Sequence, residues 1–404
     1  MPTDERKPND ALILSGARTP IGKFMGALAA VPAPRLGAVA IQAAVERAGI
    51  DPAQIDEVIM GQVVAAGSGQ APARQAGIHA GLPAEVGAFS LNKACGSGLQ
   101  AVMLAAQAIR AGDAALMVAG GMESMSRAPY LLPHAREGQR FGNQEALDAL
   151  ISDGLWCSLE DWMMGDAAEW IANEYEVTRE AMDRFALESH QKAVAAADAG
   201  KFAAEIAPVT VDLAGGRQVR VTADEGPRRD TSLEALARLR PAFQKDGKVT
   251  AGNAPGLNDG AAALVLASRA QAAALGRAPL ARVAGYTHAA VAPKELFIAP
   301  AVAIPKLLAR IGWTLADLDL IELNEAFAAQ VLADGYALAE RGWDWGKVNV
   351  NGGAIALGHP VGASGARVLV TLLNALRDRG LRRGLAALCL GGGEAVALAV
   401  EIED

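Results

Sequence analysis

The sequence predicts an α/β protein made of two copies of one unit, with a loop domain inserted between them. Apolar, strand-like runs alternate with helix-like segments along the chain, and one such segment recurs much later. Residues 45–61 and 308–324 each read as a helix closed by glycine, a short polar link and an apolar strand. One constant separation relates the matched residues Arg47 and Arg310, Gly49 and Gly312, and Asp56 and Asp319.

A second correspondence lies further along each copy. Ser97-Gly98 opens a predicted helix in the first copy, and Ser364-Gly365 opens its counterpart in the second. The helices are expected at 99–111 and 366–376, and the strands that follow them at 115–121 and 385–390. Because these strands are continuous apolar runs, we expect layered helices and mixed, mostly parallel sheets covered on both faces. Ligand sites in such folds gather at the carboxyl ends of the strands.

Residues 127–256 have no counterpart in the repeat and differ in composition from the two copies. They contain tryptophans, a charged helix-like segment and a basic stretch around Arg228. We interpret them as an inserted loop domain, because such excursions commonly carry binding surface over a rigid scaffold. The expected N-terminal half then comprises residues 1–126 and 257–280, and the C-terminal half comprises residues 281–404.

The composition argues against several classes of partner. The 404 residues are 51% hydrophobic and 20% charged and include 44 glycines, which fits a compact α/β enzyme. Only 4% are aromatic, so base-stacking platforms for single-stranded nucleic acid are not expected. The net charge of −8 gives no bulk attraction to nucleic acid or to an anionic membrane.

Cysteine usage and hydropathy point to the cytoplasm. Three widely separated cysteines form neither a disulfide framework nor a CxxC pair, and their odd number indicates a reducing compartment. With no HExxH segment either, we expect no structural metal. Residues 1–10 are polar and lack the apolar core of a signal peptide, and there is no run of about twenty apolar residues to span a bilayer. We therefore expect a cytoplasmic protein.

The most informative segment is residues 91–100, where Cys95 stands among small residues and glycines between a strand end and an alanine-rich helix. A thiol there faces the unpaired N–H groups and the positive dipole end of the helix, which favours its thiolate. Because the thiolate is the nucleophilic form of cysteine, Cys95 is a candidate covalent catalyst. The segment alone equally permits a small buried residue packed at a tight turn.

Three further residues stand at strand ends or glycine turns. His359 is suited to accept a proton near neutral pH, although a lone histidine is more often structural. Cys389 is followed by Gly391, whose backbone N–H group could contribute to an oxyanion hole, although a buried cysteine is usually inert. Asn324 ends the repeated strand where the first copy has Gly61, which suggests a site role beside that of a helix cap.

Together, Cys95, His359 and Cys389 with Asn324 resemble the reactive set of the thiolases, the acyl-CoA:acetyl-CoA C-acyltransferases. The resemblance covers essentially the full chain and includes four separated segments in the family's order. These segments are residues 120–126, 253–260, 324–327 and 358–360.

The resemblance implies a ping-pong reaction that joins or splits a carbon–carbon bond beside a thioester. In it, Cys95 takes the acyl group, His359 accepts the thiol proton, and Cys389 removes or returns the α-proton of acetyl-CoA. The backbone N–H groups of Cys95 and Gly391 form one oxyanion hole, and His359 with a water held by Asn324 forms the other. The resemblance implies no metal or resident cofactor, because coenzyme A thioesters arrive as substrates.

The same resemblance assigns residues to the coenzyme A moiety and the acyl pocket. Nine positions match residues that contact the coenzyme A moiety or the acyl group in that family: Leu155, Met163, Met164, Arg228, Phe243, Ala251, Pro255, Leu296 and Phe327. A guanidinium suits phosphates and flat rings, although Arg228 could equally be a solvated charge. Pro255 stands where many members have serine, and Met163 stands where histidine is frequent, which makes the acyl end less polar. Residues 296–300 replace a stretch that is often rich in methionine and glycine.

The favoured function is that of a soluble acetyl-CoA C-acetyltransferase, which condenses two acetyl-CoA or cleaves acetoacetyl-CoA. A longer-chain 3-ketoacyl-CoA thiolase of β-oxidation is the alternative, with the same chemistry and a deeper pocket. A decarboxylating β-ketoacyl synthase shares the duplicated fold, but Cys389 argues against it. A non-catalytic acyl-CoA binder usually lacks a reactive residue, and none is missing here. The resemblance further suggests a homodimer or a homotetramer.

Overall fold

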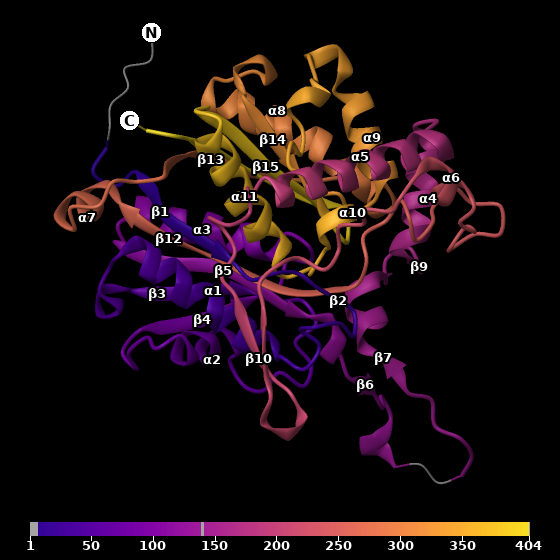
Figure 1. Cartoon of the computed structure of the whole chain (residues 1–404), viewed down its shortest axis with the longest axis horizontal. Coiled ribbons are helices and arrows are strands. Elements are labelled where there is room, and N and C mark those ends of the chain that lie inside the picture. The colour runs from indigo at the N-terminus through magenta and orange to yellow at the C-terminus, as the bar shows by residue number, and fades with distance from the viewer. Residues whose placement is uncertain (1–6, 139–140, 404) are drawn as a thin grey trace.

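Figure 1 shows the computed structural model of the chain, which describes residues 7–138 and 141–403. Most of the polar N-terminal segment on which the expectation of no signal peptide depends lies outside these residues, as does residue 404. Within the described residues, no helix is both long and apolar enough to cross a membrane.

The large sheet in the described part of the chain consists of two halves that meet at a narrow join. The N-terminal half runs inward from its edge in the order β4 (Gly87–Leu91), β3 (Glu57–Gly61), β5 (Leu116–Ser124), β12 (Asn258–Ser268) and β1 (Ala11–Arg18), with β2 (Gly22–Lys23) paired to β12. The C-terminal half runs in the order β14 (Leu320–Leu323), β15 (Arg383–Leu390), β16 (Glu394–Glu401) and β13 (Ala281–Ala290). Two residue pairs between β1 and β13 connect the halves.

Strand direction divides the sheet into outer and inner parts. At one edge β3 is parallel to both β4 and β5, and at the other edge β14 is parallel to β15. The inner pairings, from β5 through β12, β1, β13 and β16 to β15, are antiparallel. The mixed sheet is confirmed, with parallel pairing at the outer strands that a helical crossover connects. An apolar run shows only that a strand is buried on both faces. The antiparallel inner strands are buried in the same way as the parallel ones, so the apolar pattern does not reveal strand direction.

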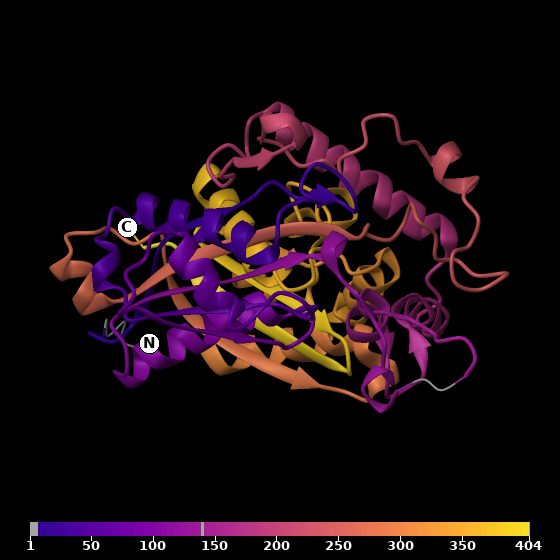
Figure 2. The same cartoon turned by 90° about the horizontal axis from the view of Figure 1, so that it is seen from below.

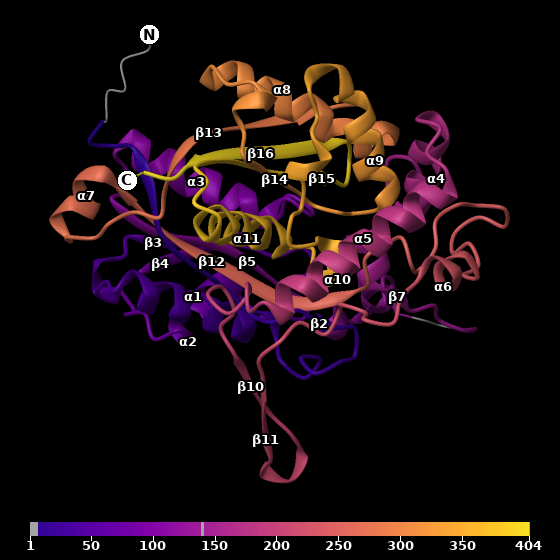
Figure 3. The same ribbon diagram turned by 45° about the horizontal axis from the view of Figure 1, so that its top comes forward.

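The helices complete a layered architecture. α3 (Ser97–Ala111) and α11 (Ser364–Asp378) lie between the two halves of the sheet, packed on each other and on strands of both (Figure 3). α1 (Ala33–Ala48) and α2 (Pro72–His79) cover the outer face of the N-terminal half, and α8 (Ala299–Ile311) covers that of the C-terminal half. α7 (Arg269–Ala274) follows β12, while α9 (Ala328–Ala337) and α10 (Ala354–Leu357) follow β14. This arrangement confirms the predicted duplicated α/β fold.

The repeat detected in the sequence corresponds to matching hydrogen bonds. Gly49 ends α1 with a φ of 62° and Gly312 ends α8 with a φ of 71°, the left-handed conformation in which glycine avoids strain. The Asp56 carboxylate accepts the N–H groups of residues 115 and 116 at the start of β5. The Asp319 carboxylate accepts those of residues 382 and 383 at the start of β15. Each aspartate therefore joins the strand that follows it in the chain to a neighbouring parallel strand in its own half of the sheet.

In the described part of residues 127–256, small hairpins and three α-helices lie at one side of the sheets. The helices are α4 (Met164–Glu174), α5 (Arg179–Asp198) and α6 (Leu233–Ala237); the strands are β6 (Tyr130–Leu131), β7 (Leu147–Asp148), β8 (Trp156–Cys157), β9 (Trp162–Met163), β10 (Val209–Asp212) and β11 (Gln218–Val221). Figure 2 shows the magenta and rose helices of this segment along one side of the molecule, and Figure 3 shows the β10–β11 hairpin projecting from it. α4 and α5 pack on α9 and α10 of the C-terminal half.

The crossing of α3 and α11 is close because glycine stands at the contact in both helices. A Cβ atom on Gly98 would lie 2.7 Å from the backbone nitrogen of Ala366. A Cβ atom on Gly365 would lie 2.3 Å from the backbone nitrogen of Leu99. These contacts are with backbone atoms, which cannot move aside as the end of a side chain can. The two matched Ser-Gly segments thus set how near the starts of the two helices approach.

We predict that Gly365→Ala destabilises the protein by about 1–3 kcal/mol, because the added methyl group overlaps the backbone of α3. Gly77→Ala is the matched control, since it also lies within a helix but its Cβ would meet Leu82 at 3.6 Å, an ordinary contact. Urea unfolding followed by circular dichroism measures both variants. Equal stability of Gly365→Ala and the parent protein would contradict the proposed close crossing.

Candidate active site

Cys95 occupies a strained turn between β4 and α3. The preceding residue, Ala94, has a φ of 43°, which is unfavourable for a residue with a Cβ atom. Asn92 Oδ1 accepts the N–H of Ala94 at 3.0 Å, and the Ser97 hydroxyl donates to the Ala94 carbonyl at 2.7 Å. The Ser97 oxygen also accepts the N–H of Lys93 at 2.8 Å. Side chains on both sides of Cys95 therefore hold this turn in a conformation that its backbone alone disfavours.

The structure brings Cys95, His359 and Cys389 to one cavity of about 130 Å³, with Gly391 in the same lining. Cys95 comes from the turn before α3, His359 from the turn between α10 and α11, and Cys389 from the carboxyl end of β15. His359 is 6% exposed and Cys389 is 1% exposed. Two sulfurs and an imidazole thus line one cavity.

Hydrogen bonds fix the orientation of His359. Its backbone N–H donates to Asn258 Oδ1 at 2.8 Å, and its Nδ1 lies 2.6 Å from the Ser364 oxygen. Since the Ser364 hydroxyl donates its own hydrogen to the Pro360 carbonyl, this pattern assigns the ring hydrogen to Nδ1. Nε2 then carries a free lone pair; it is buried and has no hydrogen-bond partner among the described residues. The ring presents a proton acceptor at Nε2.

Burial dominates the electrostatics of this cavity. It raises the pKa of Cys95 to about 11, although the backbone N–H groups of Cys95 itself and of Gly391 act in the opposite direction. It also raises the pKa of Cys389 well above its usual range, with Cys95 as the next cause. Burial and then Arg367 lower the pKa of His359 to about 3. Backbone N–H groups do act in favour of the thiolate, as the sequence suggested for this turn, but desolvation by burial is the larger effect and the net pKa of Cys95 is raised.

Glu123, at the end of β5, holds two loops beside the cysteine. Its carboxylate accepts the N–H of Val63 at 2.9 Å and that of Gly362 at 3.0 Å. It is fully buried, and burial raises its pKa to about 7. A Cβ atom on Gly121 would lie 2.0 Å from the carbonyl oxygen of Gly362, so the histidine-bearing loop approaches β5 where only glycine fits.

Asn324 lies at the end of β14, fully buried, but does not line the cavity. Its backbone N–H donates to the Ala387 carbonyl at 3.0 Å, which ties it to β15 two residues before Cys389. Its side-chain oxygen and nitrogen have no hydrogen-bond partner among the described residues. An amide so placed is available to hold a small polar molecule.

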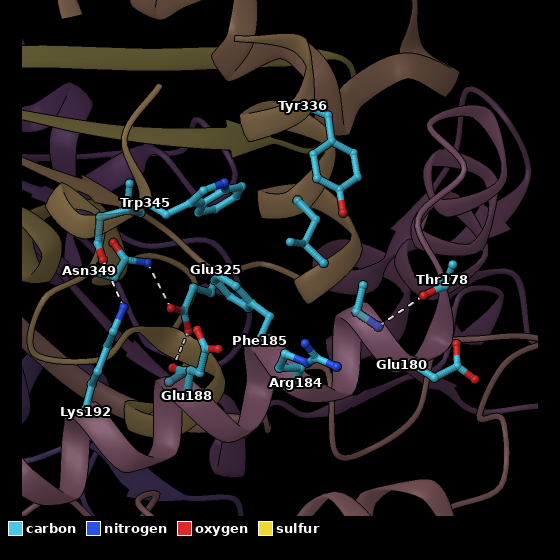
Figure 4. Close-up of a pocket in the computed structure, with 14 residues that line it drawn as sticks. Thr178, Glu180, Arg184, Phe185, Glu188, Lys192, Glu325, Tyr336, Trp345 and Asn349 are labelled. Carbon is cyan, nitrogen blue, oxygen red and sulfur yellow. Dashed lines mark hydrogen bonds between the residues drawn. The ribbon is translucent and has the colours of Figure 1, made fainter. Parts of the chain in front are cut away.

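The next residue, Glu325, faces a different hollow, of about 500 Å³, lined by one face of α5 and by α9 and Trp345 (Figure 4). Its carboxylate accepts the Ser189 hydroxyl at 2.7 Å, the Asn349 amide at 2.9 Å and the N–H of Ile355 at 3.0 Å. Because residue 355 belongs to α10, which leads to His359, Glu325 links the loop of Asn324 to that of the histidine.

Seven of the nine residues expected to contact substrate line the cavity of the two cysteines: Leu155, Met163, Met164, Phe243, Pro255, Leu296 and Phe327. The Phe327 ring packs edge-on against Phe297 and Phe243, with centroids 5.4 and 6.4 Å away. Arg228 and Ala251 are exposed and lie outside this lining. The backbone N–H of Arg228 donates to His190 Nδ1 at 3.2 Å, which places it on the same face of the segment 127–256 as α5.

Sequence reasoning missed Ser364, Asn258 and Glu123, which hold the reactive residues in place. A signal for Ser364 was present, because it matches Ser97 in the repeat and both serines stabilise the turn before a helix. Asn258 and Glu123 lie inside two of the segments that resemble the thiolases, but their roles could not be assigned, because His359 and Gly362, which they bond, lie over a hundred residues away in the chain.

Comparison with known proteins agrees with this geometry. Residues 11–270 match the family profile described as the N-terminal domain of thiolase, and residues 277–402 match that of its C-terminal domain. The chain belongs to the thiolase family. A protein of Cupriavidus necator named acetyl-CoA acetyltransferase is 56% identical over 392 residues, which are 97% of this chain and 99% of that one. One of the same name from Pseudomonas aeruginosa is 56% identical over 389 residues, 96% of this chain and 98% of that one.

Solved structures of the family superpose over nearly the whole chain. The acetyl-CoA acetyltransferase of Bacillus anthracis matches with a TM-score of 0.94 at 45% identity, covering 98% of this chain and 99% of that one. That of Syntrophomonas wolfei matches with a TM-score of 0.95 at 45% identity, covering 98% and 100%. The duplicated fold of this thiolase chain is therefore that of its relatives.

We predict that iodoacetamide alkylates Cys95 slowly at pH 7 and about tenfold faster for each pH unit up to pH 9, because only the thiolate reacts and burial raises its pKa. Peptide mapping by mass spectrometry separates Cys95 from the other two cysteines, and Cys95→Ser gives the background. A rate that levels off below pH 8 would show instead a thiolate paired with imidazolium.

Proposed function

We propose that this protein is an acetyl-CoA C-acetyltransferase that reversibly condenses two acetyl-CoA into acetoacetyl-CoA and coenzyme A through an acyl-cysteine. The observation that carries the proposal is the meeting of Cys95 with the buried side chains of His359 and Cys389 in one small cavity. Relatives that share about half of the sequence over nearly its full length are named acetyl-CoA acetyltransferases. The two sulfurs favour this chemistry over that of a single-cysteine synthase.

The first half-reaction transfers an acetyl group to Cys95. Nε2 of His359 takes the thiol proton while the sulfur attacks the thioester carbonyl of acetyl-CoA. The backbone N–H groups of Cys95 and Gly391 already face the sulfur, so they are placed to stabilise the negative oxygen that forms beside it. The carbon–sulfur bond to coenzyme A breaks, and the leaving thiolate takes the proton back from His359.

The second half-reaction makes the carbon–carbon bond. His359 takes the proton of the Cys389 thiol, and the resulting thiolate removes the α-proton of a second acetyl-CoA. The enolate oxygen is stabilised by Nε2–H of His359 and by a water on Asn324. The enolate carbon attacks the acetyl carbonyl, the bond to Cys95 breaks, and this sulfur recovers its proton from His359. Both cysteines end as thiols, as burial favours.

Substitution of the cysteines tests the two steps separately. We predict that Cys95→Ser abolishes acetylation by acetyl-CoA, and that Cys389→Ser still acetylates residue 95 but loses condensation by at least about a hundredfold. Mass spectrometry follows the acetyl group and a thiol assay follows coenzyme A release. Cys157→Ser is the matched control, expected to keep both steps. Condensation at the parent rate in Cys95→Ser would refute the mechanism.

The cavity supports a short acyl group. It measures about 130 Å³, and its lining includes the bulky apolar side chains of Met163, Met164 and Leu296. We therefore predict that thiolysis is fastest with acetoacetyl-CoA and that kcat/KM falls about tenfold or more with 3-ketohexanoyl-CoA or longer substrates. Initial rates with both substrates decide between them. A preference for the longer substrate would favour the alternative, a 3-ketoacyl-CoA thiolase of β-oxidation.

We further propose a cytoplasmic homodimer or homotetramer that uses no metal or bound cofactor. The edge strand β4 and its half-exposed Phe89 offer a surface for a second subunit. In the part of the chain that the structure describes, no three histidine, cysteine or acidic side chains are grouped so that they could hold a metal ion. Light scattering on the purified protein measures the number of subunits.

A further inference from the structure

Asp334, on α9, carries a buried carboxyl group that the proposed mechanism does not use. Its side chain is 0% exposed, and its hydrogen-bond partners in the described part of the chain are two N–H groups. Gln330 Nε2 donates to its Oδ2 at 2.7 Å, and the backbone N–H of Ala301 donates to its Oδ1 at 3.1 Å. Burying a carboxyl group with no positively charged partner is costly. An apolar side chain would avoid that cost but could not make these two bonds.

Gln330 extends the link from Asp334 to the cavity of the two cysteines. It is fully buried and lies one helical turn before Asp334, on the same face of α9. Its Oε1 accepts the backbone N–H of Ala326 at 3.1 Å, so Nε2 is the atom that faces the carboxyl group. The same N–H also contacts the Asn324 carbonyl at 3.1 Å. Ala326 and the next residue, Phe327, both line the cavity.

Ala301 connects Asp334 to a second wall of the same cavity. It is the third residue of α8, and the residue before this helix gives it no side-chain cap. Asp334 supplies a cap from α9 instead, because it accepts one of the N–H groups that the first turn of α8 leaves free. The short helix Pro293–Ile298 leads directly into α8, and its Leu296 and Phe297 line the cavity.

The two walls meet at an aromatic contact. The rings of Phe297 and Phe327 pack edge-on with their centroids 5.4 Å apart. An apolar contact of this kind tolerates small displacements, whereas hydrogen bonds have preferred directions and lengths. The bonds of Asp334 and Gln330 reach backbone N–H groups on both sides of this contact, at Ala301 and at Ala326.

We propose that Asp334 and Gln330 are positioning residues that hold these two walls together and so limit the length of the acyl group that Cys95 accepts. The inference rests on the proposed function, because it concerns the acyl group of that reaction. Neither side chain lines the cavity, so both act through the backbone of the walls. Loss of either bond lets the walls separate and admits a longer acyl chain.

A change of one atom in Asp334 is enough to break the link. Burial raises the pKa of this carboxyl group well above its usual range, and the two N–H donors oppose the shift. With or without its proton, a carboxyl group can accept a hydrogen bond at each oxygen, whereas an amide accepts at only one. In Asp334→Asn, therefore, one of the two N–H donors faces another donor.

The test measures thiolysis of acetoacetyl-CoA and of 3-ketohexanoyl-CoA by the parent protein and by Asp334→Asn. The ratio of kcat/KM for the shorter over the longer substrate is expected to fall about fivefold or more, because looser walls discriminate less. The double variant Gln330→Glu with Asp334→Asn exchanges the amide and the carboxyl group, so that all three bonds can form again with the middle one reversed. It is expected to restore the parent ratio to within about twofold.

Asp319→Asn is the matched control. Its carboxylate also accepts two backbone N–H groups, but at the opposite end of β14 from Asn324. This variant is expected to keep the parent ratio of the two substrates. Thermal unfolding measures the stability of each variant. If Asp334→Asn does not fold, Gln330→Met removes the bond to Ala326 at similar side-chain length, and the same fall in the ratio is expected.

A second readout does not depend on catalysis. Iodoacetamide and the bulkier N-ethylmaleimide both react with the thiolate of Cys95, so the ratio of their rates at one pH does not depend on the pKa of the thiol. The relative rate of N-ethylmaleimide is expected to rise in Asp334→Asn and to return to the parent value in the double variant. Peptide mapping by mass spectrometry assigns the label to Cys95.

A substrate ratio that Asp334→Asn leaves unchanged, or that the double variant does not restore, would overturn the inference and leave the pair a structural feature alone. Failure of the proposed function looks different: the parent protein would cleave neither substrate, whereas the two alkylation rates would still report on the walls.

Discussion

The close crossing of α3 and α11 is the constraint on which the rest of the site depends. Gly98 and Gly365 leave no room for a Cβ atom, so the first turns of the two helices meet backbone to backbone. Cys95 stands just before the first helix, and His359 lies five residues before Ser364, the first residue of the second. Bringing the helix starts together therefore brings the nucleophile and its base to one place, although they are far apart in the chain.

Around that crossing, buried polar side chains hold the loops in place by hydrogen bonds. Ser97 and Ser364 fix the turns before the two helices, and Glu123 joins the loop that follows β3 to the loop that leads to α11. The crossing fixes where the segments that carry Cys95 and His359 enter their helices, and these hydrogen bonds fix the conformation of the segments themselves. Glu325 adds a link between the loop of Asn324 and the segment that leads to His359. A short-lived change in any of these bonds would move a reacting group by a distance that matters for catalysis.

Burial gives this site its chemical character. Helix N-termini and backbone N–H groups are often taken to make a cysteine acidic, but here desolvation outweighs them and both thiols stay protonated. An uncharged histidine can act on an uncharged thiol. The thiol proton moves to the imidazole only when substrate is bound, because the negative charge that then develops on the substrate oxygen is stabilised by fixed N–H donors.

Local pattern was enough to foresee the two copies, the helices that open at Ser97 and Ser364, and the aspartates that recur at equal spacing. These features depend on neighbours in the chain, and glycine, proline and apolar spacing record them directly. Strand direction, the charge state of Cys95, the places of Arg228 and Ala251 outside the cavity, and the partners of His359 could not be read in this way. Each depends on which distant segments surround a group and exclude water from it, and only the packed chain specifies those surroundings.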